Sequence, residues 1–266
     1  MRIGVHCPIS DGFKKSIQYI LEVGGNTIQI FSGNPRGWDK NTISNIEAGT
    51  FKTLREEHNI YPLIVHAPYL INIASPNEKI RKKSIKALKN ETKRCDILNA
   101  DYLILHPGNF LNSTLDKGIE NHINSLNQIF KQNNFKVNLL IENTPGQGTS
   151  IGANLDNLLY IRDKLIKKID FCLDTAHGFQ AGYKPIELVT HKISKYAKVI
   201  HINDSKTSLG SRKDLHQHIG KGKIGIKGFK LMINYPDWRN IPFILETPWN
   251  TEMDKKNIDL IKKLAS

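Results

Sequence analysis

The sequence predicts a (β/α)8 barrel, the TIM-barrel fold, in which eight parallel strands each precede a helix. Eight short apolar runs recur along the 266 residues, and amphipathic segments separate them. Such alternation is typical of a parallel sheet. About 250 residues are needed to close eight units into one barrel, so we expect residues 1–266 to form one domain. An open doubly wound sheet is the structural alternative, but it would hold the ends of its edge strands too far apart to share one site.

The apolar runs themselves are the predicted strands, because strands favour β-branched and other apolar residues. In chain order they cover residues 2–6, 27–31, 61–66, 102–106, 138–143, 170–174, 198–204 and 242–246. No run approaches the roughly 18 residues that a membrane-spanning helix needs.

Apolar residues at helical spacing mark the segment that follows each strand. In the first of these segments Phe13, Ile17 and Ile20 lie on one helix face. The predicted helices cover residues 13–24, 43–58, 77–100, 115–132, 154–166, 185–196, 227–235 and 252–266. The segment 203–225 is too long for a simple turn between strand and helix, and a long ordered loop in a compact domain is usually functional.

Six of the predicted strands carry a histidine or a carboxylate at or near their ends. These residues are His66, His106, Glu142, Asp174, His201 and Glu246. Burying an imidazole or a carboxylate there costs free energy unless the group is paired or bound to metal. In a closed parallel barrel the carboxyl ends of all strands meet at one face, where barrel enzymes carry their active sites. We therefore expect the six side chains to converge.

Three further residues extend this set. His177 lies three positions after Asp174, and Asp214 and His216 alternate on an extended loop, where they face the same side. Imidazole and carboxylate groups without cysteine suit Zn²⁺ or Mn²⁺. Nine such residues exceed the needs of one tetrahedral ion, so the sequence predicts a cluster of two or three ions with at least one bridging carboxylate.

Composition indicates the kind of partner and the cellular compartment. The net charge of +13 and the pI near 9.5 favour a polyanionic partner such as nucleic acid, although solvated lysine faces would account for the same excess. Cys7, Cys95 and Cys172 are far apart and odd in number, so we expect a reducing compartment and no disulfide framework. The N-terminus lacks a signal pattern. We expect an intracellular protein, whether of a bacterial cytoplasm or nucleoid, a nucleus, or a virus and its host cell.

Seven segments carry a family resemblance. They are FSGNPRGW (31–38), HAPYLINIASP (66–76), LILHPGN (103–109), LIENTPGQG (140–148), CLDTAHGFQAGY (172–183), HINDSKTSLGSRKDLHQHIGKGKIG (201–225) and ILETP (244–248). In these segments the chain resembles the endonuclease IV type of apurinic/apyrimidinic (AP) endonucleases, and the resemblance extends over nearly the whole chain. The most specific part is HINDSK followed by GSRxDxHxHIG.

The resemblance implies a barrel that holds three zinc ions, with Mn²⁺ able to substitute. The implied ligand sets are His66, His106 and Glu142 for the first ion, Glu142 again with Asp174, His201 and Glu246 for the second, and His177, Asp214 and His216 for the third. Glu142 and Glu246 are the implied catalytic residues, and Glu142 is the bridging carboxylate.

The resemblance also implies that Arg36, Tyr69 and Leu70 enter the DNA at a lesion. An apolar wedge of this kind is a known way to kink a duplex. The sequence departs from the family pattern at Lys221, where many members carry glutamate. This lysine changes the local charge and removes no implied ligand.

The expected function is hydrolysis of the phosphodiester 5′ to an abasic site, which leaves a 3′-hydroxyl and a 5′-deoxyribose phosphate during base excision repair. Clustered divalent ions suit this chemistry, because they neutralise the phosphodiester, activate water and stabilise the leaving oxygen. The expected partner is double-stranded DNA with abasic or 3′-blocked lesions, bound by a monomer.

Two alternatives remain open. A metal-dependent sugar isomerase or epimerase would need only the four-ligand set of Glu142, Asp174, His201 and Glu246. The other five candidate ligands and the basic charge favour the nuclease over this enzyme. A non-catalytic basic module that binds nucleic acid would explain the charge and leave all nine ligand-type residues unexplained.

Overall fold

Eight parallel strands close into a barrel in the computed structural model, which describes residues 1–38 and 41–265. The barrel strands are β1 (Ile3–Cys7), β2 (Thr27–Phe31), β3 (Leu63–His66), β4 (Tyr102–Leu105), β5 (Asn138–Glu142), β6 (Asp170–Asp174), β7 (Ala197–His201) and β10 (Phe243–Leu245). Each pairs in parallel with the next along the chain, and β10 closes the ring by pairing with β7 and β1. The predicted TIM barrel is confirmed.

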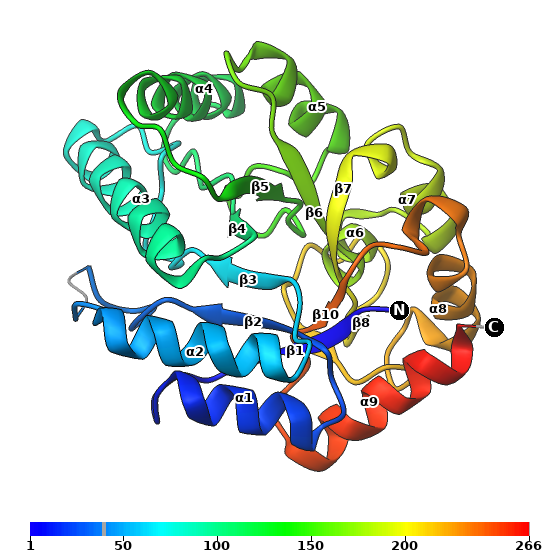
Figure 1. Ribbon diagram of the computed structural model, residues 1–266. Coiled ribbons are helices and arrows are strands. Elements are labelled where there is room, and N and C mark those ends of the chain that lie inside the picture. The colour runs from blue at the N-terminus through cyan, green and yellow to red at the C-terminus, as the bar shows by residue number, and fades with distance from the viewer. Residues whose placement is uncertain (39–40, 266) are drawn as a thin grey trace.

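Helices surround the barrel on its outside (Figure 1). They are α1 (Phe13–Glu22), α2 (Asn45–Glu57), α3 (Glu78–Leu98), α4 (Leu115–Gln132), α5 (Leu155–Lys164), α7 (Pro185–Thr190), α8 (Gly225–Ile233) and α9 (Thr251–Leu264). Asn77, Thr114 and Asn250 begin α3, α4 and α9, because their side chains accept hydrogen bonds from otherwise unpaired N–H groups of the first turn. Within the described ranges, no helix has both the length and the apolar character that crossing a membrane requires.

The helix predicted over 185–196 is shorter in the structure. It ends as α7 at Thr190, and a separate 3-10 turn follows at Ser194–Tyr196. The indole Nε1 of the buried Trp238 donates to Ser194 Oγ at 2.6 Å and holds this turn against the core. A tertiary contact therefore overrides the helical pattern of the sequence.

The strand predicted over 198–204 leaves the barrel after His201. Asp204–Ser205 form a two-residue strand, β8, which pairs antiparallel with β9 (His216–Gln217). The end of the predicted strand thus belongs to a small hairpin within the long segment 203–225.

The barrel interior holds a layer of apolar side chains directly below the candidate ligands. Its members are Ile64, Ile104, Leu140, Cys172, Val199 and Ile244, each at most 1% exposed. Side chains alternate between the two faces of a strand, so the residue two positions further along the chain, at the end of each strand or directly after it, also faces inward. Those six residues are His66, His106, Glu142, Asp174, His201 and Glu246. The pleat of the strands therefore places all six at the carboxyl end of a dry core.

Candidate metal centre

The first group of candidate ligands lies at the ends of β3, β4 and β5. Nε2 of His66 and Nε2 of His106 each lie 3.1 Å from Oε2 of Glu142. Glu142 is completely buried, whereas His106 is 28% exposed. Ligand atoms of the three residues lie within 4.8 Å of one another, so a single cation can contact all of them.

The other oxygen of Glu142 belongs to a second group. Its Oε1 lies 3.0 Å from Nδ1 of His201, and that nitrogen lies 3.3 Å from Oε2 of Glu246. Asp174 completes the group, with Oδ2 4.0 Å from the same nitrogen. Glu142 therefore turns one oxygen toward each group, as a bridging carboxylate must.

The third group lies on a short helix and on the β9 hairpin. The helix, α6 (Thr175–Ala181), was not predicted from the sequence. It begins directly after β6, where an oxygen of Asp174 accepts the backbone N–H of His177 at 2.7 Å. Nε2 of His177 lies 3.3 Å from both Oδ1 of Asp214 and Nε2 of His216. The helix cap thus places two candidate ligands beside each other.

Asp174 has a more central place than the expected ligand sets gave it. Its Oδ2 also lies 3.7 Å from Nε2 of His216, and Asp174, His177 and His216 present ligand atoms within 4.8 Å of one another. Asp214 lies on the outer side, with 43% of its side chain exposed. The structure therefore brings all nine candidate residues together and makes Asp174 a link between the second and third groups.

Hydrogen bonds on the outer ring nitrogens orient the histidines. Nδ1 of His66 bonds to the backbone carbonyl of the next residue at 2.7 Å, and Nδ1 of His216 bonds to that of Glu246 at 3.0 Å. Nδ1 of His177 bonds to the carbonyl of Asn143, also at 3.0 Å, and lies 3.2 Å from Oε1 of Glu142. Because a carbonyl oxygen only accepts, Nδ1 carries the proton when the ring is neutral, and Nε2 then keeps its lone pair toward the cluster. The donor set therefore fits a cation.

Two inward-facing residues of the centre were missed in the sequence, Gln29 and His6. Gln29 is completely buried in β2, and its Nε2 donates to Glu246 Oε1 at 2.6 Å. Its Oε1 accepts from Nε2 of His201 at 2.8 Å, which leaves Nδ1 of that ring facing the cluster. Nδ1 of His6 lies 3.3 Å from the same oxygen of Glu246. These contacts fix the orientation of Glu246 and His201 from β1, the neighbour of β10, and from β2 beside it.

Two asparagines that follow candidate ligands were also missed. Asn203 donates from Nδ2 to Asp174 Oδ2 at 2.6 Å and accepts the backbone N–H of Glu246 at 2.7 Å. Asn143 accepts the backbone N–H of Asp174 at 2.7 Å. Neighbouring strand ends are therefore joined by side-chain amides, which limits the movement of the carboxylates.

Burial and charge act in opposite directions on the ionisable groups. Burial raises the pKa of Glu142, but His201 and His106 beside it hold that pKa well below its ordinary value. Burial lowers the pKa of His177, whereas nearby carboxylates, chiefly Asp174, raise that pKa well above its ordinary value. The buried carboxylates therefore demand positive charge close by, which protonated histidines or divalent cations can supply.

Cys172 is the one thiol beside the second group, among the described residues. Its Sγ lies within 4.8 Å of ligand atoms of Glu142 and His201. Burial raises the pKa of this thiol to about 12. The nine candidate residues themselves offer nitrogen and oxygen donors, which Zn²⁺ and Mn²⁺ accept.

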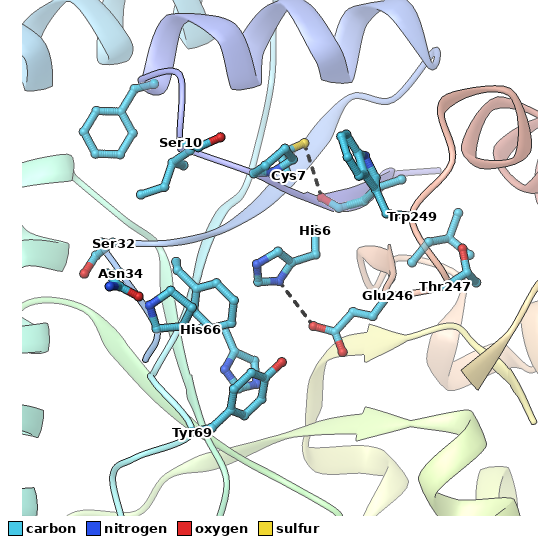
Figure 2. Close-up of a pocket in the computed structure, with 18 of the residues that line it drawn as sticks. His6, Cys7, Ser10, Ser32, Asn34, His66, Tyr69, Glu246, Thr247 and Trp249 are labelled. Carbon is cyan, nitrogen blue, oxygen red and sulfur yellow. Dashed lines mark hydrogen bonds and ion pairs between the residues drawn. The ribbon is translucent and has the colours of Figure 1, made fainter. Parts of the chain in front are cut away.

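The cluster opens into a pocket of about 1240 Å³ (Figure 2). His66, His106 and Glu246 line it together with Phe31 and Tyr69. Tyr69 is 64% exposed, and the centre of its ring lies 5.7 Å from that of His66 and 5.9 Å from that of His106. An aromatic side chain thus stands directly at the open side of the first group.

Arg36 and Leu70, the other two residues expected to contact DNA, lie in the loops after β2 and β3. Arg36 is exposed in the loop after β2, where its backbone N–H bonds to Asn34 Oδ1 at 2.9 Å. Leu70 is half-buried and lines a separate small hollow with Trp38. The contact of these residues with DNA stays a prediction.

Helix α3 holds the loop that carries Arg36. Arg94 donates from Nε to Ser32 Oγ at 2.9 Å and from Nη1 to the carbonyl of Asn41 at 2.7 Å. Glu91 accepts from the same Ser32 hydroxyl at 2.6 Å. Ser32 and Asn41, which lie on either side of Arg36 in the chain, are therefore tied to one helix.

Known proteins share this fold and much of this sequence. Residues 17–264 match the family described as the xylose isomerase-like TIM barrel. The chain is 41% identical to the probable endonuclease 4 of Halothermothrix orenii over 99% of both chains. It is 40% identical to that of Thermosipho africanus over 99% of this chain and 98% of the relative.

Solved structures give the same result. Endonuclease IV from Thermus thermophilus matches with a TM-score of 0.87 and 30% identity, over 99% of this chain and 98% of that chain. A D-psicose 3-epimerase from Clostridium cellulolyticum covers both chains completely with a TM-score of 0.76, but at 14% identity it shares the fold alone. The chain therefore belongs to the endonuclease IV type of apurinic/apyrimidinic endonucleases, within the xylose isomerase-like TIM-barrel family.

Proposed function

We propose that the chain is an AP endonuclease of DNA base excision repair. It hydrolyses the phosphodiester 5′ to an abasic site and leaves a 3′-hydroxyl and a 5′-deoxyribose phosphate. The observation that carries this proposal is the junction of three groups of ligand-type side chains, in which the two oxygens of Glu142 face different groups. Membership of the endonuclease IV family supports it.

The three groups would hold three zinc ions, with Mn²⁺ able to replace zinc. When bound, clustered divalent ions neutralise the phosphodiester, activate water for attack and stabilise the leaving oxygen. The contribution of the chain is to hold the ligand atoms in place, since hydrogen bonds to backbone carbonyls and side-chain amides fix the rings and carboxylates before substrate arrives.

Glu142 and Glu246 are the proposed catalytic residues, and they have different positions. Glu142 is completely buried and joins the first two groups. Glu246 is 15% exposed and borders the pocket, so it can face the substrate. Gln29 and His6 contact its Oε1, and its Oε2 lies beside His201. Glu142 therefore organises the centre, while Glu246 acts at its open side.

The proposed partner is double-stranded DNA with an abasic site or a blocked 3′ end, bound by a monomer inside the cell. The net charge of +13 suits a polyanion. A duplex without one base is locally unstacked and bends at low cost, so a protein can select it by deformation. Tyr69 and Leu70 would form the wedge, and Arg36 would fill the gap in the stack.

A sugar epimerase is the second candidate, because Glu142, Asp174, His201 and Glu246 alone would hold one ion. An epimerase would leave the remaining five residues of the cluster without a role. It would also leave the basic charge unexplained, since a sugar is neutral. The nuclease accounts for both features.

The first prediction concerns metal content. Purified protein should contain about three zinc ions per chain, because the three groups each offer at least three ligand atoms. His216→Ala should reduce the content by about one ion, since Nε2 of His216 faces the third group. The measurement is elemental analysis after removal of free metal. One tightly bound ion per chain, in wild-type protein that does not cleave an abasic duplex, would favour the epimerase.

The second prediction concerns Glu142. Glu142→Gln should lower kcat by at least about 100-fold, the usual effect of removing one electrostatic element of an active site, because an amide cannot bridge two cations as a carboxylate does. Affinity for the abasic duplex should persist. Steady-state cleavage and equilibrium binding measure the two effects, with Glu120→Gln on the exposed face of α4 as the control. Near-normal turnover in a metal-replete Glu142→Gln protein would contradict the role of Glu142.

The third prediction concerns salt. If phosphate contacts supply most of the affinity, log K for the abasic duplex should fall linearly with log salt, with a slope of about −0.9 for each phosphate neutralised. Titrations of one oligonucleotide at several salt concentrations give this slope. An affinity that does not change with salt would count against a DNA substrate.

The fourth prediction concerns lesion recognition. Replacing Arg36, Tyr69 and Leu70 together by alanine should reduce the ratio of affinities for matched abasic and intact duplexes. Metal content and affinity for intact DNA should change much less, since the wedge acts only where the stack is open.

The control for this variant replaces an exposed arginine, tyrosine and leucine elsewhere, namely Arg239, Tyr160 and Leu231. Both triple variants are measured at one salt concentration. An unchanged ratio in the first variant would mean that the three residues only pack the loops.

A further inference from the structure

Trp249 is a large aromatic side chain that lies exposed beside the metal centre. It is 72% exposed and lines the same pocket as His66 and Glu246. Figure 2 shows it on the opposite side of the pocket from Tyr69, with His6 and Glu246 between them. Single exposed apolar residues are common on protein surfaces, so exposure alone does not give Trp249 a role.

What distinguishes Trp249 is that its position is fixed by a chain of hydrogen bonds. Its indole Nε1 donates to the hydroxyl of Tyr19 at 3.0 Å, and that hydroxyl donates to Asp254 Oδ2 at 2.6 Å. Asp254 lies in the first turn of α9 and is 4% exposed. The indole is thus held by a buried carboxylate while its ring remains open to solvent.

The neighbouring loop, which carries Lys221, is also held by a buried carboxylate. The backbone N–H groups of Gly220 and Gly222, on either side of it, both donate to Oδ2 of the completely buried Asp204 at 3.0 Å. A Cβ atom at Gly222 would lie 2.4 Å from Asp204 Oδ1, so this close approach requires glycine. Lys221 is exposed, and its Nζ lies 4.0 Å from Sδ of Met253 in the first turn of α9.

Asn257 of α9 ties the two loops together. Its Oδ1 accepts the backbone N–H of Ile219 at 3.2 Å, and its Nδ2 donates to Thr247 Oγ1 at 3.1 Å. Ile219 lies two residues before Lys221, and Thr247 lies two residues before Trp249. The loop of Trp249, which lines the pocket, and the loop of Lys221, which lies outside its lining, are therefore tied to the same helix.

We propose that Trp249 and Lys221 form a nucleotide shelf, on which one nucleotide of the bound DNA lies as its backbone enters the metal centre. The indole stacks on the nucleobase, and the ammonium group contacts a phosphate beside it. Stacking accepts every base, because each has a π face, so the shelf adds affinity without sequence preference. This inference rests on the proposed function and adds a contact on the side of the pocket opposite Tyr69.

The two residues make different physical contributions, so their variants have different signatures. Trp249→Ala should weaken binding of an abasic duplex by roughly 5- to 150-fold, the range of losing one base–aromatic stack, and leave the salt slope unchanged. Trp249→Phe should keep most of the affinity. Lys221→Gln should reduce the magnitude of the salt slope by about 0.9, the contribution of one phosphate. All these variants should keep their metal content.

Fluorescence tests the stacking directly. Binding is measured in a Glu142→Gln background, in which the duplex should remain uncleaved. Stacking of a base on Trp249 should quench indole emission. The measurement is made in a Trp38→Phe variant, because Trp38 lies two residues after Arg36 in a loop expected to contact DNA. The quench should disappear when Trp249→Phe is added, which leaves the buried Trp238. Matched controls are Tyr160→Ala on α5 and Lys198→Gln near the start of β7, which lie away from the pocket.

The outcomes separate this inference from the proposed function. Wild-type protein that neither binds nor cleaves an abasic duplex would overturn the function itself. Cleavage by wild type, with unchanged affinity and quench in the Trp249 variants, would overturn the shelf alone. A change in only one of the two signatures, affinity at Trp249 or salt slope at Lys221, would overturn the shelf as a joint unit.

Discussion

The centre depends on one buried carboxylate, that of Glu142. A charged group without solvent is stable only with partners on both oxygens, and here each oxygen has a different set: His66 and His106 on one side, His201 and His177 on the other. These histidines lie at the ends of β3, β4 and β7 and on α6, so satisfying Glu142 requires the barrel to close with the correct register. The interaction that organises the site is therefore also a constraint on the fold.

Six of the candidate residues could be predicted because they end apolar strands, and the carboxyl ends of parallel strands meet at one face of a closed barrel. The structure adds a second reason. The pleat has a period of two, so a residue two positions beyond a buried apolar side chain faces the same interior. Leu140 and Glu142 are an example, and both are buried. Gln29 escaped this reasoning because an amide inside a strand has no distinctive pattern. Its role follows from contact with Glu246, at the far end of the chain, which exists only after closure.

Two other features of the structure, the β8–β9 hairpin and helix α6, also differ from the prediction. Asp204 follows an apolar run, so the sequence predicts it as the end of a barrel strand. In the structure it belongs to a hairpin, because the partner residues of β8 lie at 216–217. Its buried carboxylate accepts the backbone N–H groups of Gly220 and Gly222. Helix α6 was missed because its start depends on a cap by Asp174, a residue that reads from the sequence as a ligand alone. Residues with two roles are therefore the hardest to predict from local patterns.

Other polar groups, buried or partly buried, hold the loops that surround the cluster. Asp254 anchors the loop of Trp249 through Tyr19, Asp204 anchors the loop of Lys221, and Arg94 binds the loop of Arg36 at one position before that residue and one after it. Each anchor places an exposed side chain without burying it. Loops positioned by a rigid scaffold can meet a ligand with little loss of conformational entropy. Polar groups that bond to loop backbone or to a chain of hydrogen bonds thus position side chains both in the centre and on the surface around it.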